Sequence, residues 1–406
     1  MKKIELLSPA GNYEKLEMVY NYGADAAYIG GKLFNLRAFA DNFNDDELEK
    51  AVDLAHKLNK KIYITLNVIP HNEDLKIMPD YIKYLDSLNI DGVIVADMGV
   101  FQIVKENSDI PINISTQASN TNWASVKMWK ELGAKRVILA REVSIDEIKQ
   151  IKDKVPDIEL EAFVHGAMCM SISGRCLLSN YLTGRDANRG ACAQPCRWKY
   201  YLMEETRPGE YMPITEDENG TYIMNSKDLC TIEFLDKMIE SGLDSLKIEG
   251  RMKGIYYAAT TTKIYRQAID KYYSGNWNFE QKWLDDLMTI SHRNYTSGFY
   301  FKKPGTKDHN YDSSSYKHTH KLVGKVIKDL GNDHYLIEIR NKLSVGDQVD
   351  IIKPLGDPIP IKFPKMQDNK NGENIDTANP NTIAKIKSDI KLYEKDIIRK
   401  KIKKVQ

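Results

Sequence analysis

The stretch "YGADAAYIGG" (22–31) carries the pattern that decides the fold. A helical pattern ends at a short break, and a run of apolar residues follows that stops at a polar residue or a glycine. The same unit recurs at "LNIDGVIVAD" (88–97), "LGAKRVILAR" (132–141) and "SGLDSLKIEG" (241–250). Apolar runs that alternate with amphipathic helices are typical of parallel strands buried on both faces.

Four more runs complete a set of eight strands: "IELLSPA" (4–10), "KIYITLN" (61–67), "INISTQ" (112–117) and "ELEAFVHG" (159–166). Helical patterns such as "DDELEKAVDLAHKLNK" separate most of them. Eight such units predict an α/β fold of the TIM-like (β/α)8 barrel type. A doubly wound open sheet is built from the same units and is the alternative.

The domain organisation follows from where this pattern stops. We expect a barrel over residues 1–302 with an insertion at about 166–240, a polar linker over 303–320 and a small β-barrel domain over 321–406. The last domain alternates like short antiparallel strands. Its C-terminal tail is locally basic, which is typical of a strip that contacts RNA phosphates, or of a solvated helix or frayed terminus.

Composition excludes several classes of protein. A formal net charge of +1 provides no global attraction to nucleic acid, so any RNA contact has to be local. The N-terminal residues lack the apolar run of a signal peptide, and no stretch approaches the length of a transmembrane helix. Five cysteines in 406 residues do not make a disulfide framework. We therefore expect a cytoplasmic protein with reduced thiols and no membrane contact.

Polar residues stand at the carboxyl ends of most predicted strands. In a (β/α)8 barrel these ends form the face that carries chemistry. The residues concerned are Ser8, Gly30, Gly31, Asn67, Asp97, Gln117, Arg141, Glu142, His165, Lys247 and Glu249. Each of them alone could be a solvated strand end or a helix cap, but their recurrence predicts a site at the mouth of the barrel.

All five cysteines fall in the long segment between the seventh and eighth strands: Cys169, Cys176, Cys192, Cys196 and Cys230. They contain no CxxC pair, so neither a zinc ribbon nor a thioredoxin motif fits. An iron–sulfur cluster needs converging thiolates with looser spacing, and nearby glycines and arginines suit its sulfurs and its negative charge. A zinc site and free or catalytic thiols stay open as alternatives.

Several segments resemble the collagenase-like peptidase family of unassigned catalytic type. They are "ELLSPAGNYEKL", "YGADAAYIGG", "FVHGAMCMSISGRCLLSNYLTGRDANRGACAQPCRWKY", "MNSKDLC", "SLKIEGRMKGIYYAATTTKIYRQAID" and "NYTSGFY". The resemblance covers the barrel from residue 4 to about 300, and the small C-terminal β domain is also a family feature. It implies hydroxylation of tRNA, with 5-hydroxyuridine formed at the wobble position and prephenate as a required metabolite.

The resemblance also implies a cofactor, an iron–sulfur cluster of the 4Fe-4S type. The thiolates that hold it in relatives fall on Cys169, Cys176, Cys192 and Cys230, with Cys196 in reserve. The tRNA and prephenate are the expected partners. Whether a protein partner or an electron donor takes part is open.

Other residues receive expected roles at the mouth of the barrel. The two carboxylates of prephenate call for cations, and Arg185, Arg251 and Lys247 are the candidates. Asn67 and Gln117 are expected to bind substrate, while His165, Lys247 and Glu249 are the candidate catalytic residues. An ion pair that closes the barrel is the structural alternative for Lys247 and Glu249, and a structural hydrogen bond is the alternative for His165.

The same residues leave three other functions open. Hydroxylation of ribosomal RNA is the alternative within the same family. A metal-dependent peptidase using His165 and Glu249 is possible, but the chain has no HExxH or GxSxG motif. A non-catalytic RNA-binding scaffold would leave the polar strand ends and the cysteines unexplained.

Overall fold

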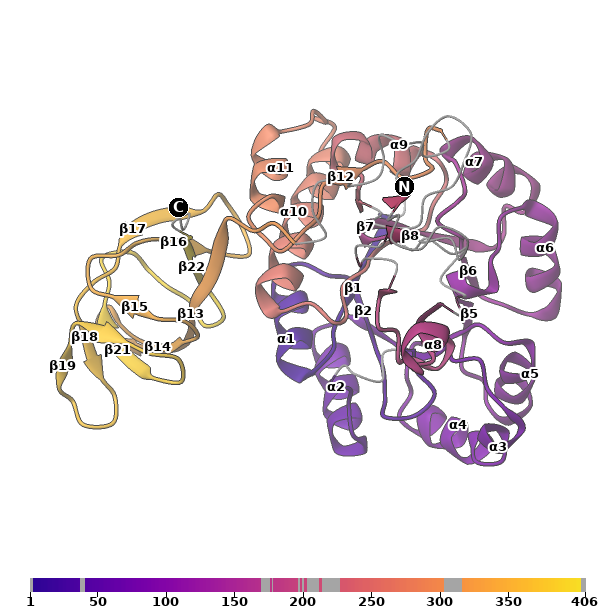
Figure 1. The fold of residues 1–406 in the computed structure, drawn as a ribbon, viewed down its shortest axis with the longest axis horizontal. Coiled ribbons are helices and arrows are strands. Elements are labelled where there is room, and N and C mark those ends of the chain that lie inside the picture. Colours follow the sequence, from indigo (N-terminus) through magenta and orange to yellow (C-terminus); the bar gives the residue numbers. More distant parts are fainter. Residues whose placement is uncertain are drawn as a thin grey trace.

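A closed ring of eight parallel strands forms the larger domain of the computed structural model (Figure 1). The strands follow the order β11-β1-β2-β3-β4-β5-β6-β7, and pairing of β11 with β7 closes the ring. They are β1 (Glu5–Pro9), β2 (Ala26–Ile29), β3 (Lys61–Leu66), β4 (Gly92–Val95), β5 (Ile112–Ile114), β6 (Arg136–Ile138), β7 (Glu159–Ala167) and β11 (Ser245–Ile248). The closure confirms the predicted TIM-like barrel and excludes the open doubly wound sheet.

The structure describes most of the chain: residues 3–36, 41–168, 176, 178–195, 198, 201–202, 212–213, 227–302 and 316–402. Cys169, Cys196 and most of the predicted linker lie outside these ranges. In the described part of the chain, no helix is both long enough and apolar enough to span a bilayer.

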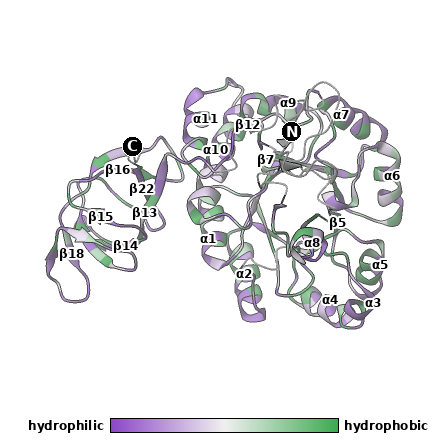
Figure 2. Cartoon of the chain, in the orientation of Figure 1, coloured by the Kyte–Doolittle hydropathy of each residue, from purple (hydrophilic) through white to green (hydrophobic). Residues whose placement is uncertain are grey.

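Helices surround the strands, and their sequences explain where they begin and end. They are α1 (Tyr13–Asn21), α2 (Asp45–Lys57), α3 (Asn72–Leu75), α4 (Met78–Ser87), α5 (Met98–Asn107), α6 (Trp123–Leu132), α7 (Ile145–Lys154), α9 (Leu235–Glu240), α10 (Ile255–Tyr273) and α11 (Gln281–Leu287). Capping boxes start α2 at Asn44 and α7 at Ser144. Gly133 ends α6 with a φ of 105°, which a glycine adopts without strain. Both hydrophilic and hydrophobic residues colour these helices, as amphipathic helices require (Figure 2).

Strand β7 is longer than its neighbours and changes partner near its end. Its residues pair in register with β11 as far as Phe163 and Lys247, and then a bulge sets His165 opposite Ile248. Beyond this point β7 pairs antiparallel with β10 (Asp228–Cys230), which in turn pairs with β12 (Tyr295–Thr296). These two strands extend the sheet above the barrel.

The insertion after β7 contributes short elements at the mouth of the barrel. They are α8 (Leu178–Thr183), the 3-10 helix η3 (Ala187–Arg189), β8 (Tyr201–Leu202), β9 (Met212–Pro213) and, before α9, the 3-10 helix η5 (Ile232–Phe234). A further 3-10 helix, η1 (Thr116–Ala118), follows β5. In the view of Figure 1, α8 lies in front of the lower part of the ring, between β2 and β5.

The C-terminal domain is an antiparallel sheet with a core of its own. Eight of its strands pair in the order β17-β16-β22-β13-β14-β21-β18-β19, and β15 pairs with β20. They are β13 (His320–Gly331), β14 (His334–Ile339), β15 (Leu343–Ser344), β16 (Gln348–Ile352), β17 (Ile359–Lys362), β18 (Met366–Asp368), β19 (Asn374–Ile375), β20 (Thr377–Ala378), β21 (Ile383–Lys387) and β22 (Ile397–Lys401).

This domain packs against the barrel beside α1, α10 and α11 (Figure 1). Ile352 and Ile397 join the barrel core, and the Tyr22 hydroxyl donates to the backbone carbonyl of Ile352 at 2.8 Å. Strand β22 contains the first residues of the basic end of the chain, and Arg399 is buried there between Asp286 of α11 and Asp350 of β16. That arginine therefore joins the two domains.

Candidate active site at the mouth of the barrel

Arg251 is fixed over the ends of β2 and β3. Its Nη1 donates to Thr65 Oγ1 at 2.7 Å and its Nη2 donates to Asn35 Oδ1. A Cβ atom added to Gly30 would lie 2.6 Å from Nη1, so glycine is the residue that leaves room for the guanidinium. The structure thus buries Arg251 and holds its planar donor group in one orientation.

Asn67 and Gln117, both predicted to bind substrate, contact each other. Asn67 Nδ2 donates to Gln117 Oε1 at 3.2 Å across the ends of β3 and β5. The backbone N–H of Leu36 donates to Asn67 Oδ1 at 3.3 Å, which ties the loop after β2 to this pair. The two amides therefore form a polar edge of the mouth.

Glu249 lies at the opposite side of the mouth, after β11. Its Oε2 accepts from the Tyr28 hydroxyl at 3.4 Å and lies 3.8 Å from Arg141 Nη2. The Arg141 guanidinium stacks over the Phe163 ring at 4.1 Å from its centroid. Arg141 and Glu249 give the mouth a cation and an anion within reach of each other.

Lys247 lies deeper in the barrel than the predicted site. Its Nζ donates to Glu161 Oε1 at 2.9 Å and lies 4.4 Å from the centroid of the Tyr28 ring. Burial lowers the pKa of Lys247, while Glu161 opposes that shift. The ion pair that the sequence offered as the structural alternative for Lys247 is present, with Glu161 rather than Glu249 as its partner.

The bulge in β7 turns His165 away from Lys247. Its ring lies 5.8 Å from that of Tyr257, 5.6 Å from that of Tyr265 and 5.3 Å from that of Tyr295, measured between centroids. Burial lowers the pKa of His165 to about 3, and the nearby His292 and Lys253 add to this effect. The imidazole is therefore neutral and faces α10, on the outer side of the strand.

The three predicted catalytic residues are consequently spread over three places. His165 faces the helices, Lys247 pairs below the mouth, and Glu249 lies at the mouth with Arg141. Glu249 and His165 are joined by a backbone hydrogen bond: the N–H of Glu249 donates to the His165 carbonyl at 2.8 Å.

The insertion is anchored to the rim of the barrel near β3. Arg189 forms a bidentate pair with Asp74, with N–O distances of 2.8 and 3.1 Å. Its hydrogen bonds lower the pKa of Asp74 to about 2. The N–H of Ile69 also donates to the Asn188 carbonyl at 3.2 Å, so η3 is held beside the mouth.

Cys176 and Cys192 lie in this anchored part of the insertion, and both sulfurs accept backbone hydrogen bonds. The N–H of Leu178 is 3.4 Å from Cys176 Sγ, and that of Gln194 is 3.3 Å from Cys192 Sγ. Backbone donors of this kind stabilise thiolates that ligate a cluster. The predicted substrate cation Arg185 is exposed here, with Nε donating to the Ala191 carbonyl and Nη2 lying 3.5 Å from the Cys192 carbonyl.

Cys230 occupies a different environment at the end of β10, opposite His165. It is buried, its Sγ lies 3.9 Å from the Tyr265 hydroxyl, and burial raises the pKa of its thiol to about 12. Across the described ranges, no three His, Cys, Asp or Glu side chains gather as a site for one metal ion. The sulfur chemistry of Cys176 and Cys192 thus fits a cluster, while Cys169 and Cys196 lie outside the described residues.

Sequence reasoning missed several residues that build the mouth. Thr65, Asn35 and Tyr28 hold Arg251 and Glu249, and Glu161 holds Lys247. A signal for Glu161 was available, because a carboxylate inside the apolar run "ELEAFVHG" needs a buried partner. Arg141 stood among the polar strand ends but was not assigned to the site.

Comparisons with known proteins agree with this architecture in both domains. Residues 11–310 match the family model for peptidase family U32, and residues 318–399 match the model for the U32 C-terminal domain. The chain is 41% identical over 404 residues to tRNA hydroxylation protein P1 of Bacillus subtilis, covering 98% of this chain and 95% of that protein. It is 39% identical to tRNA hydroxylation protein P of Escherichia coli, covering 88% and 87%.

Other relatives carry a different name. A collagenase of Porphyromonas gingivalis is 32% identical, with 86% of each chain covered. The solved structure of a U32 peptidase aligns with a TM-score of 0.39 at 16% identity, covering 62% of this chain and 95% of that one.

Proposed function

The chain belongs to peptidase family U32, and on that premise we propose that it hydroxylates tRNA in the cytoplasm, forming 5-hydroxyuridine at the wobble position. One observation carries the proposal. Relatives named tRNA hydroxylation protein P share about 40% of their residues with this chain, and the match to the Bacillus subtilis protein runs through both domains.

The chemistry explains why a cofactor belongs in the proposal. Replacing C5–H of uridine by C5–OH adds an oxygen atom and removes two electrons from the ring, and no ordinary side chain supplies either. An iron–sulfur cluster supplies redox chemistry when bound, with Cys169, Cys176, Cys192 and Cys230 as its ligands and Cys196 in reserve. The N–H donors at Cys176 Sγ and Cys192 Sγ support this assignment.

The side chains at the mouth suit a dianionic co-substrate such as prephenate. Arg251 is held by Thr65 and Asn35, so a carboxylate would meet a planar donor group that is already oriented. Arg141 adds a second cation beside Glu249. Lys247 contributes less charge to such a ligand, because Glu161 neutralises it.

Nucleoside mass spectrometry of RNA from cells with and without the gene tests the proposal. We expect deletion to remove one oxygen mass from the affected tRNA uridines, under anaerobic growth so that no oxygen-dependent pathway masks the loss. If the tRNA is unchanged and ribosomal RNA loses a hydroxyl group, the substrate is ribosomal RNA instead of tRNA. No change in either RNA would contradict hydroxylation.

A peptidase is the second candidate, supported by the relative named collagenase. The described site favours a peptidase less. The Tyr265 hydroxyl lies near both Cys230 Sγ and His165 Nδ1, but the cysteine and the histidine are both buried. A nucleophile needs access to substrate and an adjacent base. Gelatin cleavage by the purified protein, abolished by a substitution of Glu249, would establish the peptidase instead.

A further inference from the structure

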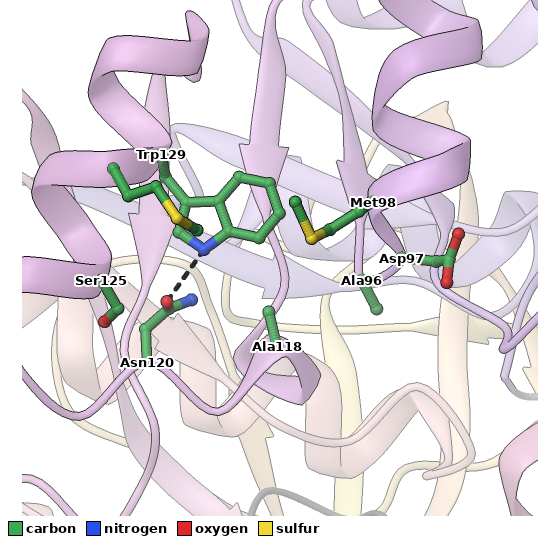
Figure 3. Close-up of a pocket in the computed structure, with 8 residues that line it drawn as sticks. Ala96, Asp97, Met98, Ala118, Asn120, Ser125 and Trp129 are labelled. Atoms are coloured by element: carbon green, nitrogen blue, oxygen red, sulfur yellow. Dashed lines mark hydrogen bonds between the residues drawn. The ribbon is translucent and has the colours of Figure 1, made fainter.

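A cavity lies between the loops that follow β4 and β5 and the helix α6 (Figure 3). Its volume is about 410 Å³, within the range of small-molecule sites. The lining residues are Ala96, Asp97, Met98, Ala118, Asn120, Ser125, Met128 and Trp129. Asp97 is one of the polar strand ends named above, and none of the other lining residues was assigned to the site.

Asn120 provides a hydrogen-bond donor with a fixed direction. The residue is 1% exposed, and its Oδ1 accepts from the Trp129 indole N–H at 2.9 Å. That bond identifies which end of the amide is oxygen. The Nδ2 group has no partner among the described residues, and Figure 3 shows it turned toward the space bounded by Trp129, Ala118 and Met98. A buried amide donor without a partner is costly, so this one is suited to an acceptor that arrives from outside.

The walls around this donor are apolar and adaptable. Met98 is 57% exposed and Met128 is 42% exposed, so two large apolar side chains remain uncovered at the rim. Methionine is flexible and polarizable, and it packs well against flat ring systems. Asp97 is engaged elsewhere, because its Oδ1 caps α5 by accepting from the N–H groups of Gly99 and Val100.

The cavity is linked to the proposed active site through adjacent residues of η1. Ala118 lines the cavity, and Gln117, the preceding residue of η1, bonds to Asn67 at the mouth. Ser119 follows with a φ of 57°, which holds the chain in a left-handed turn between η1 and Asn120. A ligand in the cavity would therefore lie against the residue that follows Gln117 in the chain.

We propose that this cavity binds a nucleobase of the substrate RNA, from a nucleotide that flanks the one at the mouth. The inference rests on the proposed function. An unstacked base has apolar faces and hydrogen-bond acceptors along its edge, and single-stranded RNA is recognised by enclosing the faces and bonding the edge. The methionines and Trp129 provide the enclosure, and Asn120 Nδ2 meets an acceptor such as a pyrimidine carbonyl.

Two substitutions test the cavity, each with a matched control. Asn120→Asp keeps an oxygen for the Trp129 indole and removes the free donor, whereas Asn122→Asp makes the same change at the exposed cap of α6. Met98→Glu places a charge at the rim, and Met288→Glu does so on the remote α11 side of the barrel. We expect an unmodified anticodon stem-loop RNA to bind about tenfold or more weakly to the first member of each pair, and within about twofold of wild type to each control.

The RNA itself supplies an independent measurement. Abasic nucleotides placed one at a time beside the target uridine should include one that weakens wild-type binding about tenfold, while Met98→Glu shows no further loss with that RNA. If both cavity variants bind the stem-loop as tightly as wild type, the inference is wrong. Should Asn120→Asp fail to fold, the binding measurements with Met98→Glu and with the abasic RNAs test the inference by themselves. A wild-type protein that hydroxylates tRNA while its cavity variants behave normally refutes the cavity alone, whereas a wild type inactive on tRNA refutes the proposed function.

Discussion

Glu161 holds two cations inside the barrel. Its Oε1 accepts from Lys247 and its Oε2 lies 2.8 Å from Arg136 Nη1, while Glu5 and Glu159 also bond to Arg136. Glu161 is 1% exposed, so its contacts with both cations are shielded from solvent. A buried charge that loses its partner keeps its full desolvation penalty.

We therefore predict that Glu161→Ala lowers the free energy of unfolding by about 3–5 kcal/mol. Urea denaturation measures the change. Asp157→Ala removes the partner of Lys130 from an exposed pair that solvent screens, so its effect on the free energy of unfolding should be far smaller. Equal effects for the two variants would show that the interior network is not what stabilises the barrel.

The cysteines give a second prediction at this scale. Single replacement of Cys169, Cys176, Cys192 or Cys230 by alanine should remove or destabilise the cluster, because an iron without its thiolate is exposed to solvent. Cys196→Ala should keep more iron and acid-labile sulfide than any of these four in anaerobic preparations. If Cys196→Ala loses its iron while Cys230→Ala keeps it, Cys196 is the fourth ligand and Cys230 is not. If all five variants keep their full iron content, the cysteines do not hold a cluster.

At the scale of elements, the 3-10 helix η3 anchors the insertion to the barrel. Arg189 bonds to Asp74 beside α3, and Asn188 bonds through its side chain to the N–H of Cys176 at 3.2 Å. The position of Cys176 thus depends on the attachment of η3 to the rim.

Arg189→Ala should loosen this attachment. We expect faster amide hydrogen exchange at Ile69 and through η3, and a pKa of Asp74 that rises from about 2 toward its ordinary value. Lys76→Ala, which removes the exposed pair with Glu73, is the control. Exchange that stays unchanged at Ile69 would mean that other contacts hold the insertion.

For the whole molecule, the contact between the two domains contains a buried carboxyl group. Asp396 is fully buried just before β22, and burial raises its pKa to about 6. The ordinary pKa of aspartate is about 3.9, so between about pH 4 and pH 6 the folded protein binds more protons than the unfolded chain. The contribution of Asp396 to stability therefore falls as the pH rises through this window.

Asp396→Asn should remove that slope, because the amide keeps an acceptor for the Tyr393 N–H and does not titrate. Urea midpoints of wild type and variant, measured from pH 4 to pH 7, should diverge as the pH rises, with the variant more stable at neutral pH. Asp389→Asn, at an exposed position of the same domain, is the control. Parallel curves for Asp396→Asn and wild type would contradict the assignment.

The sequence by itself determined the barrel, the order of its strands and the segment that contains the cysteines. Each of these depends on patterns that lie within a single element: apolar runs of strand length, amphipathic helices and glycines at the breaks. Burial acts on such patterns locally, so they can be predicted before any long-range contact is known. The polar strand ends also predicted a site around Asn67, Gln117 and Glu249, and in the structure Asn67 contacts Gln117 while Glu249 lies near Arg141.

Only the tertiary structure decided where the other side chains point and with whom they pair. One bulge between β7 and β11 turns His165 toward α10. Lys247 pairs with Glu161, a residue 86 positions away in the chain. Arg399, part of a basic tail in the sequence, became a buried link between domains. Register and pairing between distant strands depend on how whole surfaces fit together, and no pattern within one element contains that information.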